Sequence, residues 1–121
     1  MGKALIVDDS STEREIISKY LEQAGINVSM AKSGEEALEK IGNDLPDIIV
    51  LDVVLPGRSG FEICREIKAT SQTSKIPIII CSTKGTEMDK FWGMKQGADA
   101  YLPKPIDQEE FIRTVKQLIK G

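Results

Sequence analysis

Three short runs of consecutive apolar residues punctuate the chain, each bounded by polar or turn-forming residues. They span residues 4–7, 48–51 and 78–81, and they read Ala-Leu-Ile-Val, Ile-Ile-Val-Leu and Ile-Ile-Ile-Cys. A continuous apolar run of this length predicts a strand that is buried on both faces of a sheet. Residues 26–30 and 99–102 predict two further, weaker strands.

Between these runs, apolar residues recur at the spacing of amphipathic helices. In the first half of the chain, one helix is predicted to begin at Ser10 or Ser11 and to end at Gly25. A second helix begins with Ser33, which has Glu36 three residues later and so predicts a capping box.

Three more helices are predicted in the second half. One follows Gly60, and the last opens with a capping box of Asp107 and Glu110 and carries a clear apolar stripe. The helix over residues 86–96 has the weakest pattern, because Gly93 interrupts it at a cost of about 1 kcal/mol relative to Ala.

Alternation of five strands with five helices predicts the α/β class, a doubly wound parallel sheet with crossover helices on both faces. No linker or change of composition divides the chain, so we expect a single domain over residues 1–121. In such a sheet all strands end along one edge, and ligands bind there, where the strand order reverses.

Composition narrows the possible functions. The chain has 121 residues, a net charge of -3 and no block of basic residues, so direct nucleic-acid binding is not expected. No apolar run is long enough to cross a membrane and no leader is evident, so we expect a cytoplasmic protein without membrane insertion. We interpret Cys64 and Cys81 as buried free thiols, with a disulfide left open. Without histidine, a zinc site or a Ser-His-Asp triad is out of reach.

Polar side chains stand at the predicted strand ends. Asp8 and Asp9 follow the first strand, Asp52 the third, Ser82 the fourth and Lys104 the fifth. Each residue alone has an ordinary structural explanation, such as a helix cap, a local hydrogen bond or a solvated charge. The predicted architecture, however, gathers all of them at one edge of the sheet.

Three neighbouring carboxylates repel one another unless a cation offsets their charge. Mg²⁺, or Mn²⁺ in its place, takes oxygen ligands from one or two carboxylates, water and phosphate. Lys104 would neutralise a phosphoryl oxygen, and Ser82 would donate a hydrogen bond to another. Because an Asp carboxylate can accept a phosphoryl group covalently, the pattern predicts phosphoryl transfer to an aspartate.

At these positions the chain resembles the receiver domain of bacterial two-component response regulators. The resemblance covers the whole chain, from Val7-Asp8-Asp9 through Leu51-Asp52, Leu55-Pro56-Gly57, Gly60, Ser82 and Gly97-Ala98 to Lys104-Pro105. It implies the flavodoxin-like strand order 2-1-3-4-5. It also implies a phosphoacceptor that gains and loses its phosphoryl group by its own chemistry, rather than a turnover enzyme.

The resemblance implies a role for each matching residue. Asp52 is the phosphoacceptor, and Ser82 and Lys104 contact the phosphoryl group. The metal ligands are the carboxylates of Asp8, Asp9 and Asp52 and the backbone carbonyl of Val54. Tyr101 is an aromatic switch that responds to Ser82, and the peptide bond before Pro105 is cis.

The implied partners are a sensor histidine kinase or phosphotransfer protein as donor and a downstream protein target. The target would bind the face formed by the fourth helix, fifth strand and fifth helix, which is rich in aromatic and Met side chains. The alternative is that these side chains simply cover the sheet; they are Met88, Phe91, Trp92, Met94 and Tyr101. Because no further domain follows the last helix, we expect a stand-alone regulator; chemotaxis, pilus motility and phosphorelays stay open.

Three residues near the site depart from common family patterns. Val54 has no hydrogen-bonding side chain, so we expect the water that hydrolyses the acyl phosphate to be poorly held and the phosphorylated state to last. Thr83 stands where a smaller Ala is frequent and would narrow access to Asp52. Lys84 adds a positive charge at the mouth of the site, or is a solvated loop lysine.

Two other classes of function fit the sequence less well. A docking module that is never phosphorylated would not need Asp52 and Lys104. A flavin carrier would suffer from repulsion between its phosphate and the acidic pair after the first strand, and no G-x-G-x-x-G follows that strand.

Overall fold

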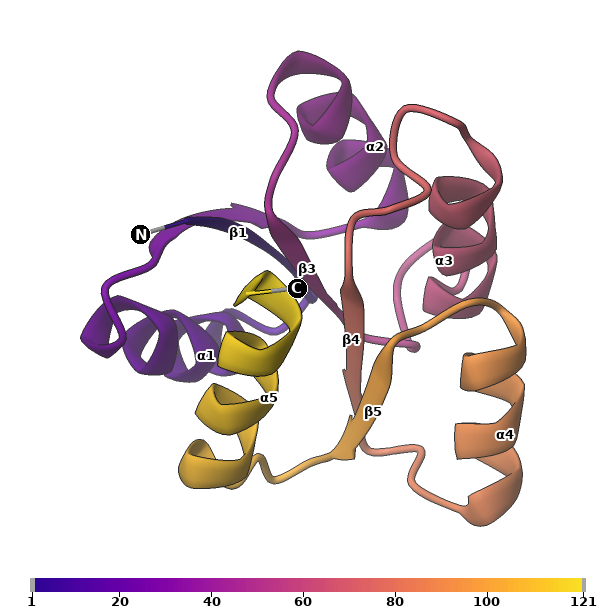
Figure 1. Ribbon diagram of the computed structural model, residues 1–121. Coiled ribbons are helices and arrows are strands. Elements are labelled where there is room, and N and C mark those ends of the chain that lie inside the picture. Colours follow the sequence, from indigo (N-terminus) through magenta and orange to yellow (C-terminus); the bar gives the residue numbers. More distant parts are fainter. Residues whose placement is uncertain (1, 121) are drawn as a thin grey trace.

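The computed structural model describes residues 2–120, which form one parallel sheet with helices on both faces (Figure 1). The strands are β1 (Lys3–Val7), β2 (Asn27–Ala31), β3 (Ile48–Leu51), β4 (Ile78–Ser82) and β5 (Ala100–Pro103). Their order is β2-β1-β3-β4-β5, and all neighbours run parallel. The predicted α/β class and strand order are confirmed, and β2 and β5 begin one residue later than expected.

The helices divide between the two faces of the sheet. They are α1 (Ser11–Gln23), α2 (Gly34–Asn43), α3 (Gly60–Ala69), α4 (Glu87–Lys95) and α5 (Gln108–Lys120). Helices α1 and α5 cover one face, and α2, α3 and α4 cover the other (Figure 1). This division follows from crossover connections that are right-handed, with the sheet wound outward from β1 in two directions.

The core consists of two layers, one on each side of the sheet. Successive side chains of a strand point to opposite faces, so a continuous apolar run feeds both layers. In β3, Ile49 and Leu51 pack beneath α2 and α3, whereas Ile48 and Val50 pack beneath α1 and α5. The strands could be recognised from sequence because both of their faces are buried.

Helix starts are fixed by side-chain caps, with one difference from expectation. Ser33 accepts a hydrogen bond from the Glu36 amide, but the Glu36 carboxylate accepts from the amide of Lys32 instead of Ser33, so the capping box is incomplete. Asp107 likewise accepts from the first-turn amides of α5. Complete capping boxes occur where none was predicted, at Ser59–Glu62 and Thr86–Asp89.

Helix α4 packs on the sheet through a glycine. Gly93 is buried, and a Cβ atom built on it would lie 2.7 Å from the ring of Tyr101. The glycine that weakened the sequence pattern therefore lets the helix approach β5. As a result, the side chains of Met88, Phe91, Trp92 and Met94 are exposed. The alternative that the five side chains cover the sheet is therefore wrong for these four, whereas Tyr101 does pack against the core.

Two further expectations concern thiols and membranes. Cys64 and Cys81 are both buried and free, which confirms their assignment as free thiols. Among the described residues, none of the helices combines the length and apolar character that a membrane span requires.

Candidate functional site

The strand register brings the predicted site residues together at the carboxyl edge of the sheet. Val7 pairs with Leu51, so the residues that follow them, Asp8 and Asp52, emerge side by side. On the other side of β3, Ser82 ends β4, and its carbonyl accepts a hydrogen bond from the amide of Lys104 at 3.0 Å. Side chains that are up to 96 positions apart thus share one site.

Lys104 links the two buried carboxylates. Its Nζ lies 2.7 Å from Oδ2 of Asp8 and 3.4 Å from Oδ2 of Asp52. Asp8 is 2% exposed, Asp52 is 8% exposed and Ser82 is fully buried. Charged groups are seldom buried to this extent unless they are paired, so the pairing accounts for how the fold tolerates them.

Every polar group of Asp8 is engaged by the protein. Its Oδ1 accepts from the amide of Ser10 at 2.9 Å, and its Oδ2 accepts from Lys104. Its backbone carbonyl accepts from Nη1 of Arg14 at 2.7 Å, and its amide donates to the carbonyl of Ala31. These four bonds fix the loop that carries Asp9. Arg14 did not stand out in the sequence, because a basic residue on a helix ordinarily faces solvent.

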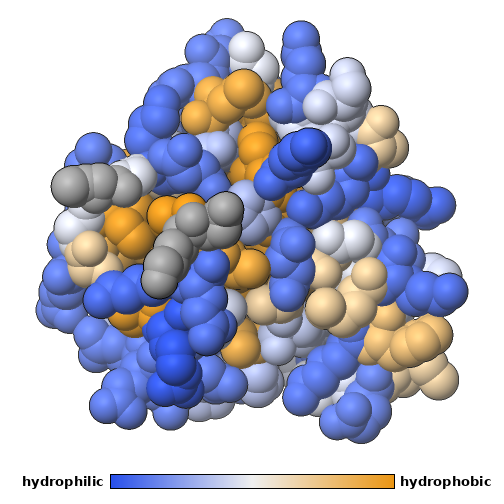
Figure 2. All heavy atoms as spheres, in the orientation of Figure 1, coloured by the Kyte–Doolittle hydropathy of each residue, from blue (hydrophilic) through white to orange (hydrophobic). Residues whose placement is uncertain are grey.

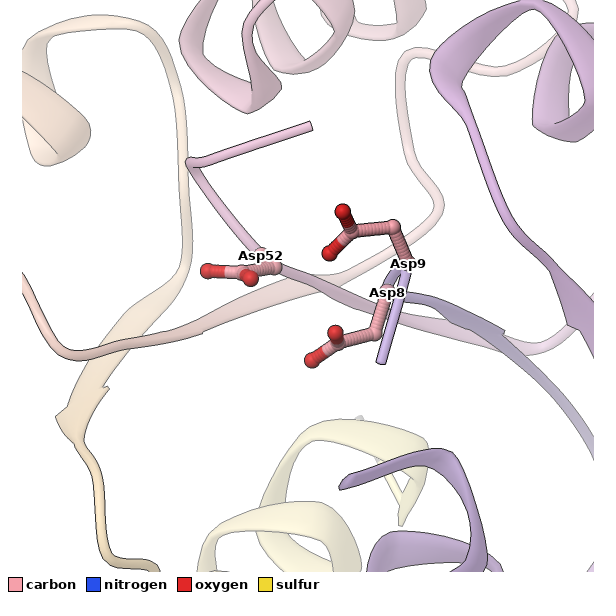
Figure 3. Close-up of side chains that lie close together, drawn as sticks. All are labelled: Asp8, Asp9 and Asp52. Atoms are coloured by element: carbon pink, nitrogen blue, oxygen red, sulfur yellow. The ribbon is translucent and has the colours of Figure 1, made fainter. Parts of the chain in front are cut away.

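Asp9 completes an acidic cluster at the end of β1. One carboxylate oxygen from each of Asp8, Asp9 and Asp52 lies within 4.8 Å of the others. Figure 3 shows Asp8 and Asp9 at the end of β1 and Asp52 at the end of β3, with their carboxyl groups gathered together. Oxygen donors of this kind fit a hard divalent cation such as Mg²⁺.

Asp52 is held by the backbone amide of the next residue and lies against Gly60. Its Oδ1 accepts from the amide of Val53 at 2.7 Å, which leaves Oδ2 on the side of Lys104. The backbone carbonyl of Asp52 is covered by Gly60, where a Cβ atom would lie only 1.9 Å from the carbonyl oxygen. Only glycine fits at that position, so the start of α3 packs directly on the backbone of the site.

The electrostatics of the site follow from burial and pairing. Burial raises the pKa of the Asp52 carboxyl, the charge of Lys104 lowers it and that of Asp8 raises it, and the net shift is upward. Burial lowers the pKa of the Lys104 ammonium, but its hydrogen bond to Asp8 and the charge of Asp52 raise it, and the net shift is again upward. Lys104 therefore stays positively charged at neutral pH.

Ser82 and Tyr101 are connected through one residue of the β4–α4 loop. The amide of Lys84 donates to Oγ of Ser82 at 3.1 Å, and the carbonyl of Lys84 accepts from the Tyr101 hydroxyl. The loop then continues to Thr86, which caps α4. The sequence prediction for Lys84 concerned its side-chain charge, whereas in the structure its backbone amide and carbonyl connect Ser82 with Tyr101.

The other predicted residues lie around this cluster. The Lys104–Pro105 peptide bond is cis. Val54 is exposed two residues beyond Asp52, and Thr83 is exposed next to Ser82. The role of the Val54 carbonyl stays a prediction.

Comparison with known proteins identifies the class to which this fold and site belong. The sequence model of the response regulator receiver domain family matches residues 4–116, so the chain belongs to that family. Receiver domains of this kind serve phosphorylation-based signalling and generally bind Mg²⁺ at an acidic pocket.

Individual relatives share the whole domain. The chain is 40% identical over 121 residues to Protein PilH of Pseudomonas aeruginosa, and the match covers all of both chains. Chemotaxis protein CheY4 of Vibrio cholerae superposes with a TM-score of 0.90 at 35% identity, covering 98% of each chain. The signal receiver domain of a signal transduction histidine kinase from Syntrophus aciditrophicus gives 0.93 at 30% identity, covering 100% of this chain and 92% of that one.

Proposed function

We propose that this protein is a signalling switch that accepts a phosphoryl group on Asp52 from the phosphohistidine of a sensor histidine kinase or phosphotransfer protein. The observation that carries the proposal is the Lys104 ammonium, 3.4 Å from Oδ2 of Asp52 and 2.7 Å from Asp8. One buried positive charge beside the candidate acceptor suits a group that arrives with negative charge. The two free thiols agree with phosphoryl transfer in a reducing compartment, the cytoplasm.

The chemical step exchanges one bond for another. An oxygen of Asp52 attacks phosphorus, a P–O bond forms, the P–N bond to the donor imidazole breaks, and the imidazole nitrogen takes up a proton. The Val53 amide holds Oδ1, so we assign the attack to Oδ2, which faces the Lys104 ammonium. Lys104 neutralises charge on the transferred group, and positioning supplies most of the catalysis.

Asp8, Asp9 and Asp52 would hold Mg²⁺, with the Val54 carbonyl as a further ligand. When bound, the ion would neutralise charge on the phosphoryl oxygens. Arg14 and Ser10 act indirectly, because they hold Asp8 and thereby position the loop that bears Asp9.

Incubation with Mg²⁺ and a small phosphodonor, followed by intact mass measurement, tests the proposal. We expect a single phosphate adduct on the wild type and none on Asp52→Asn. The matched control is Asp47→Asn, at the opposite end of β3, where the side chain is exposed and accepts from the amide of Lys3. An adduct that persists in Asp52→Asn contradicts the assignment. Absence of any adduct on the wild type would favour the phosphorylation-independent docking module.

The response would pass through Ser82 to the face formed by α4, β5 and α5, where a downstream protein binds. If the Ser82 hydroxyl turns toward a phosphoryl group, its bond from the Lys84 amide changes, and with it the loop whose carbonyl holds Tyr101. That loop leads directly into the cap of α4. The phosphorylated site and α4 would thus be coupled over a few residues.

Fluorescence of Trp92, the single tryptophan, reports on α4. We expect phosphorylation to change this signal in the wild type. Ser82→Ala should accept phosphate, as measured by intact mass, without the fluorescence change, and Tyr101→Phe should weaken the change. An undiminished change in a phosphorylated Ser82→Ala protein would contradict the coupling.

A further inference from the structure

Two parts of the surface suit contact with another protein chain. One is α4: Figure 2 shows hydrophobic atoms gathered over the lower right of the molecule, where Figure 1 places that helix, and the proposed function gives this face to the downstream partner. The other is the outer edge of β2, which ends the sheet on the side of β1. An edge strand has unpaired N–H and C=O groups to which a further strand can bind.

The backbone of β2 alternates between β1 and the open edge. The amide of Asn27 and the carbonyl of Ala31 both bind residues that flank β1. In a parallel strand the N–H and C=O of one residue point to the same side, and those of the next residue point to the other side. Val28 and Met30 therefore direct their backbone groups outward, away from β1.

Two side chains of α2 cover part of this edge. Nζ of Lys40 donates a hydrogen bond to the carbonyl of Met30. The carboxylate of Glu36 accepts from the amide of Lys32, directly after β2, at 2.6 Å. Glu36 also pairs with Lys40 one helical turn away, with 3.7 Å between Oε2 and Nζ. The pair of Glu36 and Lys40 thus reaches from α2 to the outward backbone groups of the strand.

The closure of the edge depends on these side chains and not on the body of the helix. A hollow of about 240 Å³ lies between the end of α2 and β2, and its lining includes Ser29, Lys40 and Asn43. The side chains of Lys40 and Glu36 are 43% and 38% exposed, so solvent competes for both. A change at Lys40 alone would therefore open the edge.

We propose that Lys40, held by Glu36, closes the edge of β2 against β2 of a second copy of this chain. With the edge open, two β2 strands can pair antiparallel across a twofold axis at Ser29. In that register Val28 of one copy lies opposite Met30 of the other, and each such pair exchanges two hydrogen bonds. The Met30 carbonyl that Lys40 occupies is the acceptor that the Val28 amide of the second copy needs.

The edge fits its own copy better than an unrelated strand. Each copy carries the same two outward residues, Val28 and Met30, so one antiparallel register satisfies both at once and gives an isologous contact. Ser29 would face its own copy at the axis, in the non-hydrogen-bonded pair where opposing side chains lie closest. Its small side chain allows that approach, and the two sheets would continue as one.

Removal of the Lys40 ammonium tests the proposal in the whole chain. Sedimentation velocity over a range of protein concentrations measures self-association of the wild type and of Lys40→Ala. Because the variant frees one acceptor on each copy, we expect its association constant to exceed that of the wild type at least about tenfold. Lys40→Arg keeps a donor for the Met30 carbonyl and should match the wild type. A Lys40→Ala protein that sediments like the wild type at every concentration would overturn the proposal.

Control variants show whether the dimer uses the edge of β2. Lys19→Ala makes the same change of charge on α1, where the side chain is exposed, and should match the wild type. In the Lys40→Ala background, Val28→Pro removes an outward N–H, which an edge strand tolerates, and should abolish the added association. Met30→Pro takes its place if circular dichroism shows that Val28→Pro is unfolded. Association that survives the proline, or that also appears in Lys19→Ala, would contradict pairing through this edge.

The proposal is independent of phosphorylation. Every variant keeps Asp52 and Lys104, so intact mass after phosphodonor treatment reports the proposed function separately. Hydrogen exchange gives a second measure of the edge itself: at high concentration of Lys40→Ala, the amides of Val28 and Met30 should exchange more slowly than in the wild type. Equal exchange of these amides in an associated Lys40→Ala protein would place the contact elsewhere and overturn the proposal.

Discussion

The carboxyl edge of the sheet and the outer face of α4 bury opposite kinds of side chain. At the sheet edge, Asp8, Asp52 and Lys104 are removed from water, although charged groups prefer it. On α4, Phe91 and Trp92 are left in water, although apolar groups prefer burial. Each region gives up stability relative to an ordinary interior or surface.

The two regions compensate in different ways. At the sheet edge the charges are paired with one another and with backbone amides inside the molecule. On α4 no such compensation exists within the described residues, so it would have to come from another molecule. The comparison indicates a site that is complete within one chain and a surface that becomes complete only on association.

The largest expected effect is at Lys104. Lys104→Met leaves Asp8 and Asp52 buried without their cation, and we expect metal-free protein to lose about 3 kcal/mol of unfolding free energy. Urea denaturation in a chelating buffer measures the loss. Added Mg²⁺ should restore part of it, because a divalent ion supplies charge to the same carboxylates. Unchanged stability would mean that water already screens these carboxylates, and the contrast with α4 would disappear.

Gly60 tests how tightly the backbone of the site is packed. Gly60→Ala drives a methyl group against the Asp52 carbonyl, and we expect a loss of about 2 kcal/mol or more, together with slower phosphorylation. Gly42→Ala, in α2, is the matched control. A Cβ atom there has nothing within 4 Å, so we expect a gain of up to about 1 kcal/mol. Similar results for both glycines would contradict the close approach at Asp52.

The thiol of Cys64 predicts a dependence of stability on pH. Burial raises its pKa from 9.0 to about 11 in the folded protein. Below pH 9 the thiol is neutral whether the chain is folded or not. As pH rises from 9 to about 11, only the unfolded state loses the proton, so unfolding free energy falls by up to about 1.4 kcal/mol per pH unit.

Denaturation of wild type and Cys64→Ala at several pH values isolates this contribution from other groups that titrate in the same range. We expect the variant to lose less stability between pH 9 and 11. Parallel curves would show that Cys64 ionises as readily in the folded protein as in the unfolded chain.

Val54 shares a feature with each region, since its side chain is apolar and exposed, as on α4, and lies beside the charged site at the sheet edge. Val54→Asn supplies a hydrogen-bonding group that can orient the water attacking the acyl phosphate. We expect the lifetime of phosphorylated Asp52 to shorten several-fold, as followed by the decay of the mass adduct. Equal lifetimes would remove the proposed reason for a long-lived state.

The smallest effect on stability is expected on α4. Phe91→Ala removes a large ring that is 57% exposed, so the unfolding free energy of the protein should change by less than about 0.5 kcal/mol. A loss comparable with that of a core phenylalanine would show that the ring is buried in solution. Phe111, which is fully buried, provides that reference through Phe111→Ala.

The sequence predicted most of the fold because its strands are buried on both faces and its helices carry apolar stripes. For α4 it left two readings open, an exposed partner face or a cover for the sheet, since a helix with its apolar residues outward resembles one with them inward when only spacing is considered. The role of Gly93 was hidden for the same reason, because its partner Tyr101 lies on another element. The capping boxes at Ser59 and Thr86 were legible as Ser-x-x-Glu and Thr-x-x-Asp but were not predicted.

The sequence by itself determined which polar side chains end the strands, because each follows its apolar run along the chain. Only the tertiary structure decided that Lys104 pairs with Asp8, that Arg14 holds the Asp8 carbonyl and that Gly60 rests on Asp52. These contacts depend on distances between elements, which strand register and helix packing set together. Local pattern fixes what a segment is, whereas the packing of segments fixes what its side chains meet.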